Sequence, residues 1–412
     1  MSLSRNSLGI GDRFAREAEA QLTAILKARE ESIEITPVWN KSSREHEIIH
    51  SHPSETREKA DLAVRNLNWN SAYYVDADHI NLFTVDSFVE HCDYFTIDVA
   101  HAINQPAPHR VLQEFLKENK RFIGEFYIPG IDEPYEIDSV FLERVANKFL
   151  LATIEAGMTY KHIKSRKRNV NFITEISMDE VELCQSPAEI FFILGMLRGI
   201  PADTFAPKLM GQFYKGIDYV GDVSQFKKYF NEIMLVLSHA RNIFHLSENL
   251  KISIHSGSDK FSIYPAIREA CLDHDEGIHL KTAGTTWLEE IIGLAIAGGE
   301  ALETVKSIYK ISFQRLEELS IAYKEVINID PEELPDPGIV ESWEGEKFAN
   351  TLRHIRMHQD YNPHFRQLLH IGYKVAAEMG SRYLVLLEKH RDIISQQVVE
   401  NLFDRHIIPL FS

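Results

Sequence analysis

The sequence has little cysteine and little methionine: three and eight residues among 412. Cys92, Cys184 and Cys271 are widely spaced and odd in number, so they predict neither a disulfide framework nor a CxxC metal motif. Because unpaired thiols persist in a reducing compartment, we expect a cytoplasmic protein.

Basic residues are outnumbered as well. The chain has 44 Lys and Arg against 61 Asp and Glu, which gives a formal net charge of −17. Nucleic acids and anionic membranes bind basic surfaces, so neither is expected as a partner. The apolar run around "IIGLAIAGG" is too short to span a bilayer. Asp12, Arg13 and Arg16 interrupt the N-terminal segment, which is therefore not expected to be a signal peptide.

Several catalytic motifs are missing. The sequence has no GxSxG, no P-loop and no Cys–His nucleophile pattern, so covalent catalysis through Ser or Cys is not supported. The stretch "GIGDRF" lacks the third glycine of a dinucleotide fingerprint. Histidine, in contrast, occurs 19 times. Histidine serves both as a metal ligand and as a general acid or base, so the role of each histidine has to be inferred from its position in the sequence.

Short apolar segments alternate with helical patterns along the first two thirds of the chain. This alternation is typical of βα units that form a parallel sheet. Eight strands are predicted, at 33–39, 72–80, 94–102, 121–130, 170–180, 204–213, 250–259 and 278–285. A further segment, 7–14, is either a ninth strand or the true first one.

Eight strands are enough to close a (β/α)8 barrel. The rival is a doubly wound open sheet, which usually carries the Gly-rich phosphate turn that this chain lacks. We therefore predict an α/β fold of the TIM-barrel type, with a catalytic barrel over residues 1–286. Residues 287–412 are predicted to be a C-terminal helical region that packs on the barrel.

Three histidines fall at the ends of separate predicted strands: His79, His255 and His279. The carboxyl ends of barrel strands form the active face, so these imidazoles are expected to meet there. Converging imidazoles and a carboxylate suit Zn²⁺, Mn²⁺, Fe²⁺, Co²⁺ or Ni²⁺, which predicts a divalent metal cation as cofactor. The alternative is that each histidine caps a strand and bonds a neighbouring backbone group.

Carboxylates occur at the same strand ends. Asp78 precedes His79, Glu175 lies in "ITEIS", and Asp179 follows four residues later. Two carboxylates in different environments can divide general-base and general-acid roles between them. For Glu175 the alternative is a salt bridge that faces a helix.

Cations and turns at the strand ends are candidates for holding an anionic substrate. The turns "SGS" (256–258) and "AGTT" (283–286) each precede a predicted helix, where backbone N–H groups bind anions readily. For any single lysine, a solvated surface position is the alternative. The candidate substrate-binding residues are Arg13, Lys208, Ser256, Asp259, Lys260, Lys281 and Thr285.

A second histidine pair lies near the C-terminus. His354 and His358 stand at i and i+4 in "HIRMH", so they share one face of a helix. The glutamate of the HExxH metal motif is missing between them. We therefore expect a structural role for this pair.

Six segments together carry a resemblance to a known family. The sequence is similar to the tagaturonate/fructuronate epimerase family in "SLGIGDRFA", "YYVDADHI", "FITEISMDE", "ISIHSGSDKFSIYP", "HLKTAGTTWLEE" and "FRQLLHIGYKVAAEMG". The blocks "HSGSDKF" and "HLKTAGTTW" are the most specific of these. The resemblance covers most of the chain and implies a barrel enzyme that acts on a sugar acid with the help of a divalent metal.

The resemblance also implies roles for individual residues. His79, His255 and His279 would be the metal ligands, Asp78 the proton acceptor and Glu175 the proton donor. A small sugar acid would be the partner, and the oligomeric state is left open, with a homo-oligomer compatible with the sequence.

The chemistry that the resemblance implies restricts the mechanism. The two sugars differ at a carbon that is β to the ketone, so its C–H is not acidified and enolisation cannot invert it. In a retro-aldol route, a base deprotonates the hydroxyl, the adjacent C–C bond breaks, and the aldehyde turns before the bond re-forms. A divalent cation would stabilise the enediolate charge. Oxidation and re-reduction by a bound NAD is the other route, and no dinucleotide fingerprint supports it.

Other functions remain open at this stage. A metal-dependent sugar or sugar-acid aldolase or isomerase, or a ketohexose 4-epimerase, could use the same residues. A glycosidase that uses Asp and Glu alone would need no metal. A non-catalytic sugar-acid binding protein ranks last, because a binding site rarely needs several imidazoles and two separate carboxylates.

Overall fold

Eight parallel strands form a closed barrel in the computed structural model, which describes residues 3–168, 170–282 and 285–412. Their order around the barrel follows the sequence, and β1 pairs with both β2 and β10. The predicted barrel is thereby confirmed. The strands are β1 (Asn6–Gly11), β2 (Ile35–Ser42), β3 (Tyr74–Ile80), β4 (Tyr94–Asp98), β7 (Ile173–Met178), β8 (Thr204–Pro207), β9 (Lys251–Ile254) and β10 (Ile278–Lys281).

Two of the predicted strands need comment. The segment 7–14 contains the true first strand, β1. The assignment of 121–130 to the barrel is wrong, because β5 (Gly124–Phe126) pairs antiparallel with β6 (Tyr135–Ile137) in a separate hairpin. Its side chains alternate as those of a half-buried strand do, and Phe126 is buried while Glu125 is exposed. Alternation alone therefore could not exclude the hairpin from the barrel.

Helices surround the barrel. Those within it along the chain are α1 (Ala18–Glu30), α2 (Ser43–Ile49), α3 (Pro53–Asn66), α4 (His109–Asn119), α5 (Ser139–Arg166), α6 (Pro187–Met196), α7 (Val223–Phe244) and α8 (Tyr264–Asp273). After β10 come α9 (Thr285–Ala297), α10 (Gly299–Gln314), α11 (Leu316–Ser320), α12 (Pro337–Val340), α13 (Gly345–Leu352), α14 (Pro363–Ile371), α15 (Tyr373–Glu378), α16 (Ser381–Lys389), α17 (Arg391–Glu400) and α18 (Ile408–Phe411), with a π-helical turn at Asn401–Ile407. Among the helices so described, none has the length and apolar character needed to cross a membrane.

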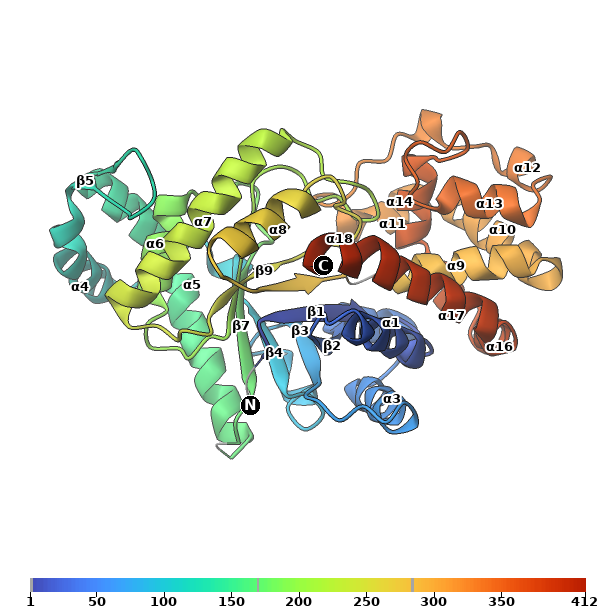
Figure 1. Cartoon of the computed structure of the whole chain (residues 1–412), viewed down its shortest axis with the longest axis horizontal. Coiled ribbons are helices and arrows are strands. Elements are labelled where there is room, and N and C mark those ends of the chain that lie inside the picture. Colours follow the sequence, from blue (N-terminus) through green and yellow to red (C-terminus); the bar gives the residue numbers. More distant parts are fainter. Residues whose placement is uncertain (1–2, 169, 283–284) are drawn as a thin grey trace.

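The C-terminal helices gather on one side of the barrel, opposite the β5–β6 hairpin (Figure 1). Helix α17 packs against both α1 and α9, so the end of the chain contacts the first helix as well as the last one of the barrel. Helix α9 begins at Thr285, so the predicted boundary at residue 286 falls in its first turn. The division into two domains stays a prediction.

The barrel interior is apolar at one end and charged toward the other. At the N-terminal end, Val38, Tyr74, Tyr94 and Ile173 form a small apolar cluster with Leu3. Side chains alternate along a strand, so the same inward rows continue into polar residues two positions later. Asp76 follows Tyr74, Thr96 follows Tyr94, and Glu175 follows Ile173. Each of these inward-facing rows therefore begins with a core residue and continues with a polar residue of the candidate site.

A buried carboxylate links the barrel to the C-terminal helices and predicts a pH effect. Burial, and then the neighbouring Asp12, raise the pKa of Glu17 from 4.5 to about 8. The folded chain keeps a proton that the unfolded chain releases above its ordinary pKa, so we expect stability to fall by a few kcal/mol as the pH rises from about 4.5 to about 8. Urea unfolding across this range measures the slope, and Glu17→Gln should make it shallower. An unchanged slope in Glu17→Gln would contradict this origin.

Candidate active site

A bulge in β3 sets the position of His79. The pairing of β3 with β4 shifts between Ala77 and Ile80, and His79 has a φ of 51°. A left-handed conformation is uncommon for a residue other than glycine and is held by the surrounding structure. Bulges re-aim a side chain at the rim of a barrel. Here the bulge brings the His79 ring to within 5.0 Å of the His255 ring, centroid to centroid.

His79, Asp179 and His255 form a group whose ligand atoms all lie within 4.8 Å of one another. The Oδ1 atom of Asp179 is 3.6 Å from His79 Nε2 and 3.0 Å from His255 Nδ1. Although that second distance is short, His255 Nδ1 makes no hydrogen bond of acceptable geometry with any residue in the described ranges. Two imidazole nitrogens and a carboxylate oxygen directed at one point are a donor set that binds Zn²⁺ and neighbouring transition metals.

Two further carboxylates orient these histidines. Asp78 Oδ1 lies 2.8 Å from His79 Nδ1, and Glu175 Oε1 lies 2.8 Å from His255 Nε2. Each ring thus uses one nitrogen on a carboxylate and presents the other to Asp179. Metal-binding histidines in proteins are generally held in this way. The predicted catalytic carboxylates therefore contact the candidate ligands directly.

Lys281 lies at the centre of the charged interior. Its Nζ is 2.9 Å from Asp76 Oδ2, 2.8 Å from Asp78 Oδ1 and 2.9 Å from Glu175 Oε1. A Cβ on Gly9 would lie 2.9 Å from Lys281 Cγ, so glycine on β1 leaves the space that this side chain occupies. The ammonium group is thus enclosed by three carboxylates.

The charges in this cluster depend on one another. Burial disfavours the charged forms, but Lys281 together with a neighbouring histidine, His79 for Asp78 and His255 for Glu175, holds the pKa of both carboxyl groups well below their usual values. The carboxylates overcome burial in the same way and hold the pKa of Lys281 well above its usual value. Burial raises the pKa of Asp76 to about 6 despite Lys281. Asp78 and Glu175 are therefore ionised at neutral pH.

His279, the third predicted ligand, is not brought into the group. Its Nδ1 lies 2.9 Å from Ser7 Oγ, and burial lowers its pKa to about 3. The ring is buried, and its Nε2 has no hydrogen-bond partner among the residues that the structure describes. Metal binding by His279 stays a prediction, and Asp179 takes the third place in the group that the geometry defines.

A family model for tagaturonate epimerases (UxaE) matches residues 1–407. The chain belongs to the tagaturonate epimerase family. A tagaturonate/fructuronate epimerase of Thermotoga maritima is 28% identical over 421 residues, which cover 98% of this chain and 80% of that protein. The family resemblance found in the sequence is thereby confirmed, as is the class of enzyme.

Solved structures agree on the fold. A glycerol complex of the fructuronate-tagaturonate epimerase UxaE from Cohnella laeviribosi matches with a TM-score of 0.82 at 20% identity, over 100% of this chain and 82% of that one. The native structure of the same protein matches with a TM-score of 0.79. At this identity the match supports the barrel with its C-terminal helices.

Three of the predicted substrate-binding residues in this family member are engaged elsewhere. Arg13 pairs with Glu45, donates to the His370 carbonyl, and lies over the Tyr373 ring at 3.9 Å. The Lys260 ammonium donates to the carbonyls of Tyr214, Ile217 and Ser258. Asp259 pairs with Arg366 of α14 at 3.0 Å. Such buried, paired groups connect the barrel loops to the C-terminal helices.

Lys281, a fourth candidate, is enclosed by three carboxylates, whereas Ser256, Thr285 and Lys208 have polar groups without a described partner. The Ser256 hydroxyl makes no hydrogen bond to any described residue, and its backbone has a φ of 49°. Thr285 is buried, and its hydroxyl likewise has no partner within the described part of the chain. Lys208 follows β8 and is partly buried. Of the predicted "AGTT" turn, residues 283–284 lie outside the described residues. The binding roles stay predictions.

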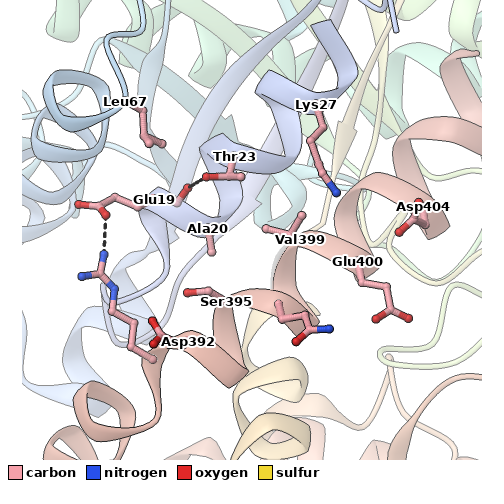
Figure 2. Close-up of a pocket in the computed structure, with 12 residues that line it drawn as sticks. Glu19, Ala20, Thr23, Lys27, Leu67, Asp392, Ser395, Val399, Glu400 and Asp404 are labelled. Atoms are coloured by element: carbon pink, nitrogen blue, oxygen red, sulfur yellow. Dashed lines mark hydrogen bonds and ion pairs between the residues drawn. The ribbon is translucent and has the colours of Figure 1, made fainter. Parts of the chain in front are cut away.

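A groove elsewhere on the epimerase does not carry these features. It lies between α1 and α17, with Glu19, Lys27 and Glu400 among its lining residues, and Figure 2 shows its mixture of charges. The Glu19 carboxylate there already pairs with Arg391. No histidine is among the residues that line it. The barrel mouth remains the candidate active site.

Asp179 is the residue to which sequence reasoning assigned no role. The feature of the sequence that could have identified Asp179 is its position at the end of a strand, directly after the buried Met178. Glu175, Asp76 and Asp98 are also carboxylates at or near strand ends, so the sequence could not distinguish Asp179 from them. The structure separates them, because Asp179 alone of these four stands in the group with His79 and His255.

Proposed function

We propose that this chain is a metal-dependent epimerase that interconverts D-tagaturonate and D-fructuronate by retro-aldol chemistry. The family match over residues 1–407 supports the reaction. The observation that carries the mechanism is the convergence of His79, Asp179 and His255 beside the ionised Asp78. We also propose that the enzyme works in the cytoplasm.

The three ligand atoms fit a divalent cation. His79 and His255 each have the second nitrogen fixed by a carboxylate, so that the first is free for a ligand bond. Asp179 Oδ1 lies between these two nitrogens. A cation bound there would supply Lewis-acid stabilisation of the oxygen charge that develops in the substrate.

Asp78 is in the state that a proton acceptor needs. It takes the proton from the hydroxyl of the carbon to be inverted, and the electrons of that O–H bond form the aldehyde as the adjacent C–C bond breaks. The electrons of the C–C bond pass into the enediolate. After the aldehyde has turned, the enediolate carbon attacks its other face and the new alkoxide needs a proton.

Lys281 connects the two carboxylates that handle these protons. Its Nζ is 2.8 Å from Asp78 Oδ1 and 2.9 Å from Glu175 Oε1. The ammonium can donate a proton to Glu175 while it accepts one from protonated Asp78. Glu175, which is ionised at rest, gains in this way the proton that a donor must have.

An isotope experiment tests the route. When the reaction runs in D₂O, we expect no deuterium at the inverted carbon, because the retro-aldol path breaks a C–C bond and leaves that C–H intact. NMR and mass spectrometry of the product measure the incorporation. Deuterium at that carbon would replace the retro-aldol path by direct deprotonation.

The same assay separates the related reactions. An aldolase releases two fragments that NMR detects, whereas the proposed epimerase returns a six-carbon product. Full turnover of hexuronates after exhaustive chelation would remove the metal from the proposal. Turnover of a neutral ketohexose at an equal rate would point to a ketohexose 4-epimerase.

A further inference from the structure

We infer that Lys215, on the loop between β8 and α7, binds the carboxylate of the hexuronate. This inference rests on the proposed function and adds a residue that determines specificity for a sugar acid over a neutral sugar. Lys215 was not among the cations that the sequence singled out. The argument starts from the state of the other cations near the barrel mouth.

Three other basic groups of this end are already engaged. The Lys281 ammonium is enclosed by Asp76, Asp78 and Glu175. The Lys260 ammonium uses three carbonyl oxygens, and Arg13 is held by Glu45 and by a backbone carbonyl. A substrate carboxylate could reach any of these groups only by displacing an existing partner.

Lys215 differs, because its ammonium has no hydrogen bond or ion pair with any residue that the structure describes. The side chain is nevertheless partly buried. Burial, and then Arg13, lower the pKa of Lys215, while Glu180, Glu45 and Asp179 oppose this shift. A cation that has lost part of its water without a counter-ion is costly, and an anionic ligand removes that cost.

The chain topology places Lys215 at the mouth, because its loop follows the carboxyl end of β8. Asp179, one of its influencing groups, belongs to the candidate metal group, and Glu180 directly follows it at the end of β7. Strand β8, which leads into the Lys215 loop, pairs with β7 and β9. Lys215 therefore lies on the same side of the barrel as Glu175 and His255.

The backbone on both sides of Lys215 is fixed. Its N–H donates to the Val326 carbonyl at 2.8 Å, and the Gly216 carbonyl accepts from Arg366 Nε at 2.6 Å. The carbonyls of Tyr214 and Ile217 accept from Lys260. A loop with this many anchors presents the lysine in one place, which reduces the entropy lost when a ligand binds.

Lys228 is the comparison. It is also a lysine and lies on α7, the helix that follows the Lys215 loop. Its side chain is 81% exposed and pairs with Glu232 at 3.9 Å. Exposed pairs of this kind contribute little, so an equal loss of charge at Lys228 should leave the mouth unchanged.

The test compares Lys215→Ala, Lys215→Arg and Lys228→Ala in the metal-loaded protein. With D-fructuronate, Lys215→Ala should raise KM about 10- to 100-fold, as expected for a lost charged hydrogen bond. Its kcat should change little, because the contact is equally present in the ground and transition states. Lys215→Arg should restore most of the affinity, and Lys228→Ala should behave as wild type.

A neutral analogue supplies the readout that a structural role would not move. Calorimetric binding of D-fructose, which has no carboxylate, should be equal in wild type and Lys215→Ala. If KM for D-fructuronate is unchanged, or if both ligands weaken together, the inference is overturned while the proposed function stands. If wild type neither binds nor converts hexuronates, the proposed function and this inference fail together.

Discussion

Replacing Lys281 with methionine is expected to destabilise the protein by about 3–5 kcal/mol, the cost typical of breaking a buried ion pair from one side. Asp76, Asp78 and Glu175 would remain in the barrel without their shared cation. We also expect turnover to fall more than about 100-fold, since the two proton-handling carboxylates lose both their charge balance and their connection. Urea unfolding and an epimerase assay measure the two effects.

Lys310→Met is the control for the loss of a lysine charge. Lys310 pairs with Glu341, but the two side chains are 48% and 55% exposed. Exposed pairs contribute little to stability, so this variant should unfold like wild type. Equal stabilities of Lys281→Met and Lys310→Met would show that the interior carboxylates accept protons instead of relying on Lys281.

The purified protein is expected to hold about one equivalent of a divalent metal, among Zn, Mn, Fe, Co and Ni, and to lose it in His255→Ala and in Asp179→Ala. Each variant removes one of the three ligand atoms that converge at the mouth. Epimerase activity should disappear with the metal. Elemental analysis after reloading with each metal measures the content independently of activity.

His358→Ala is the matched histidine control, because His358 is partly exposed and lies in the "HIRMH" segment outside the group. It should keep both metal and activity. His279→Ala decides the open question of the third histidine: loss of metal would confirm it as a ligand, and retention would make it a structural partner of Ser7. Undiminished metal in His255→Ala and Asp179→Ala would contradict the site.

The sequence predicts the barrel because apolar strand patterns and helical patterns alternate regularly, and closure follows from their number. It predicts β1 poorly, since "SLGIG" has small residues where a strand normally has large ones. The structure gives the reason: a Cβ on Gly9 would meet Lys281 and His279. A strand whose residues are small because the adjacent β10 needs the space has no strong apolar pattern of its own.

Part of the candidate site could likewise be predicted from the sequence, and part could not. His79 and His255 could be found because they end apolar strands, and both lie in the metal group. The sequence could not show which lysine and arginine side chains lack a partner, because their partners lie on distant segments of the chain. The Lys260 ammonium donates hydrogen bonds to carbonyls more than forty residues earlier in the chain. The Lys215 loop is anchored by Arg366, 150 residues after Gly216. Residue type at a strand end does not reveal such partners.

The packing of α17 between α1 and α9 has a consequence for how the protein is made. Helix α1 leaves the ribosome early, but its partner α17 begins at Arg391, close to the end of the 412-residue chain. Until then, the buried side of α1 that faces α17 has no cover. Strand β1 likewise has one unpaired edge until β10 is made, because these two strands pair to close the barrel. The final packing of α1 and the closure of the barrel therefore both depend on segments that are made hundreds of residues after α1 and β1.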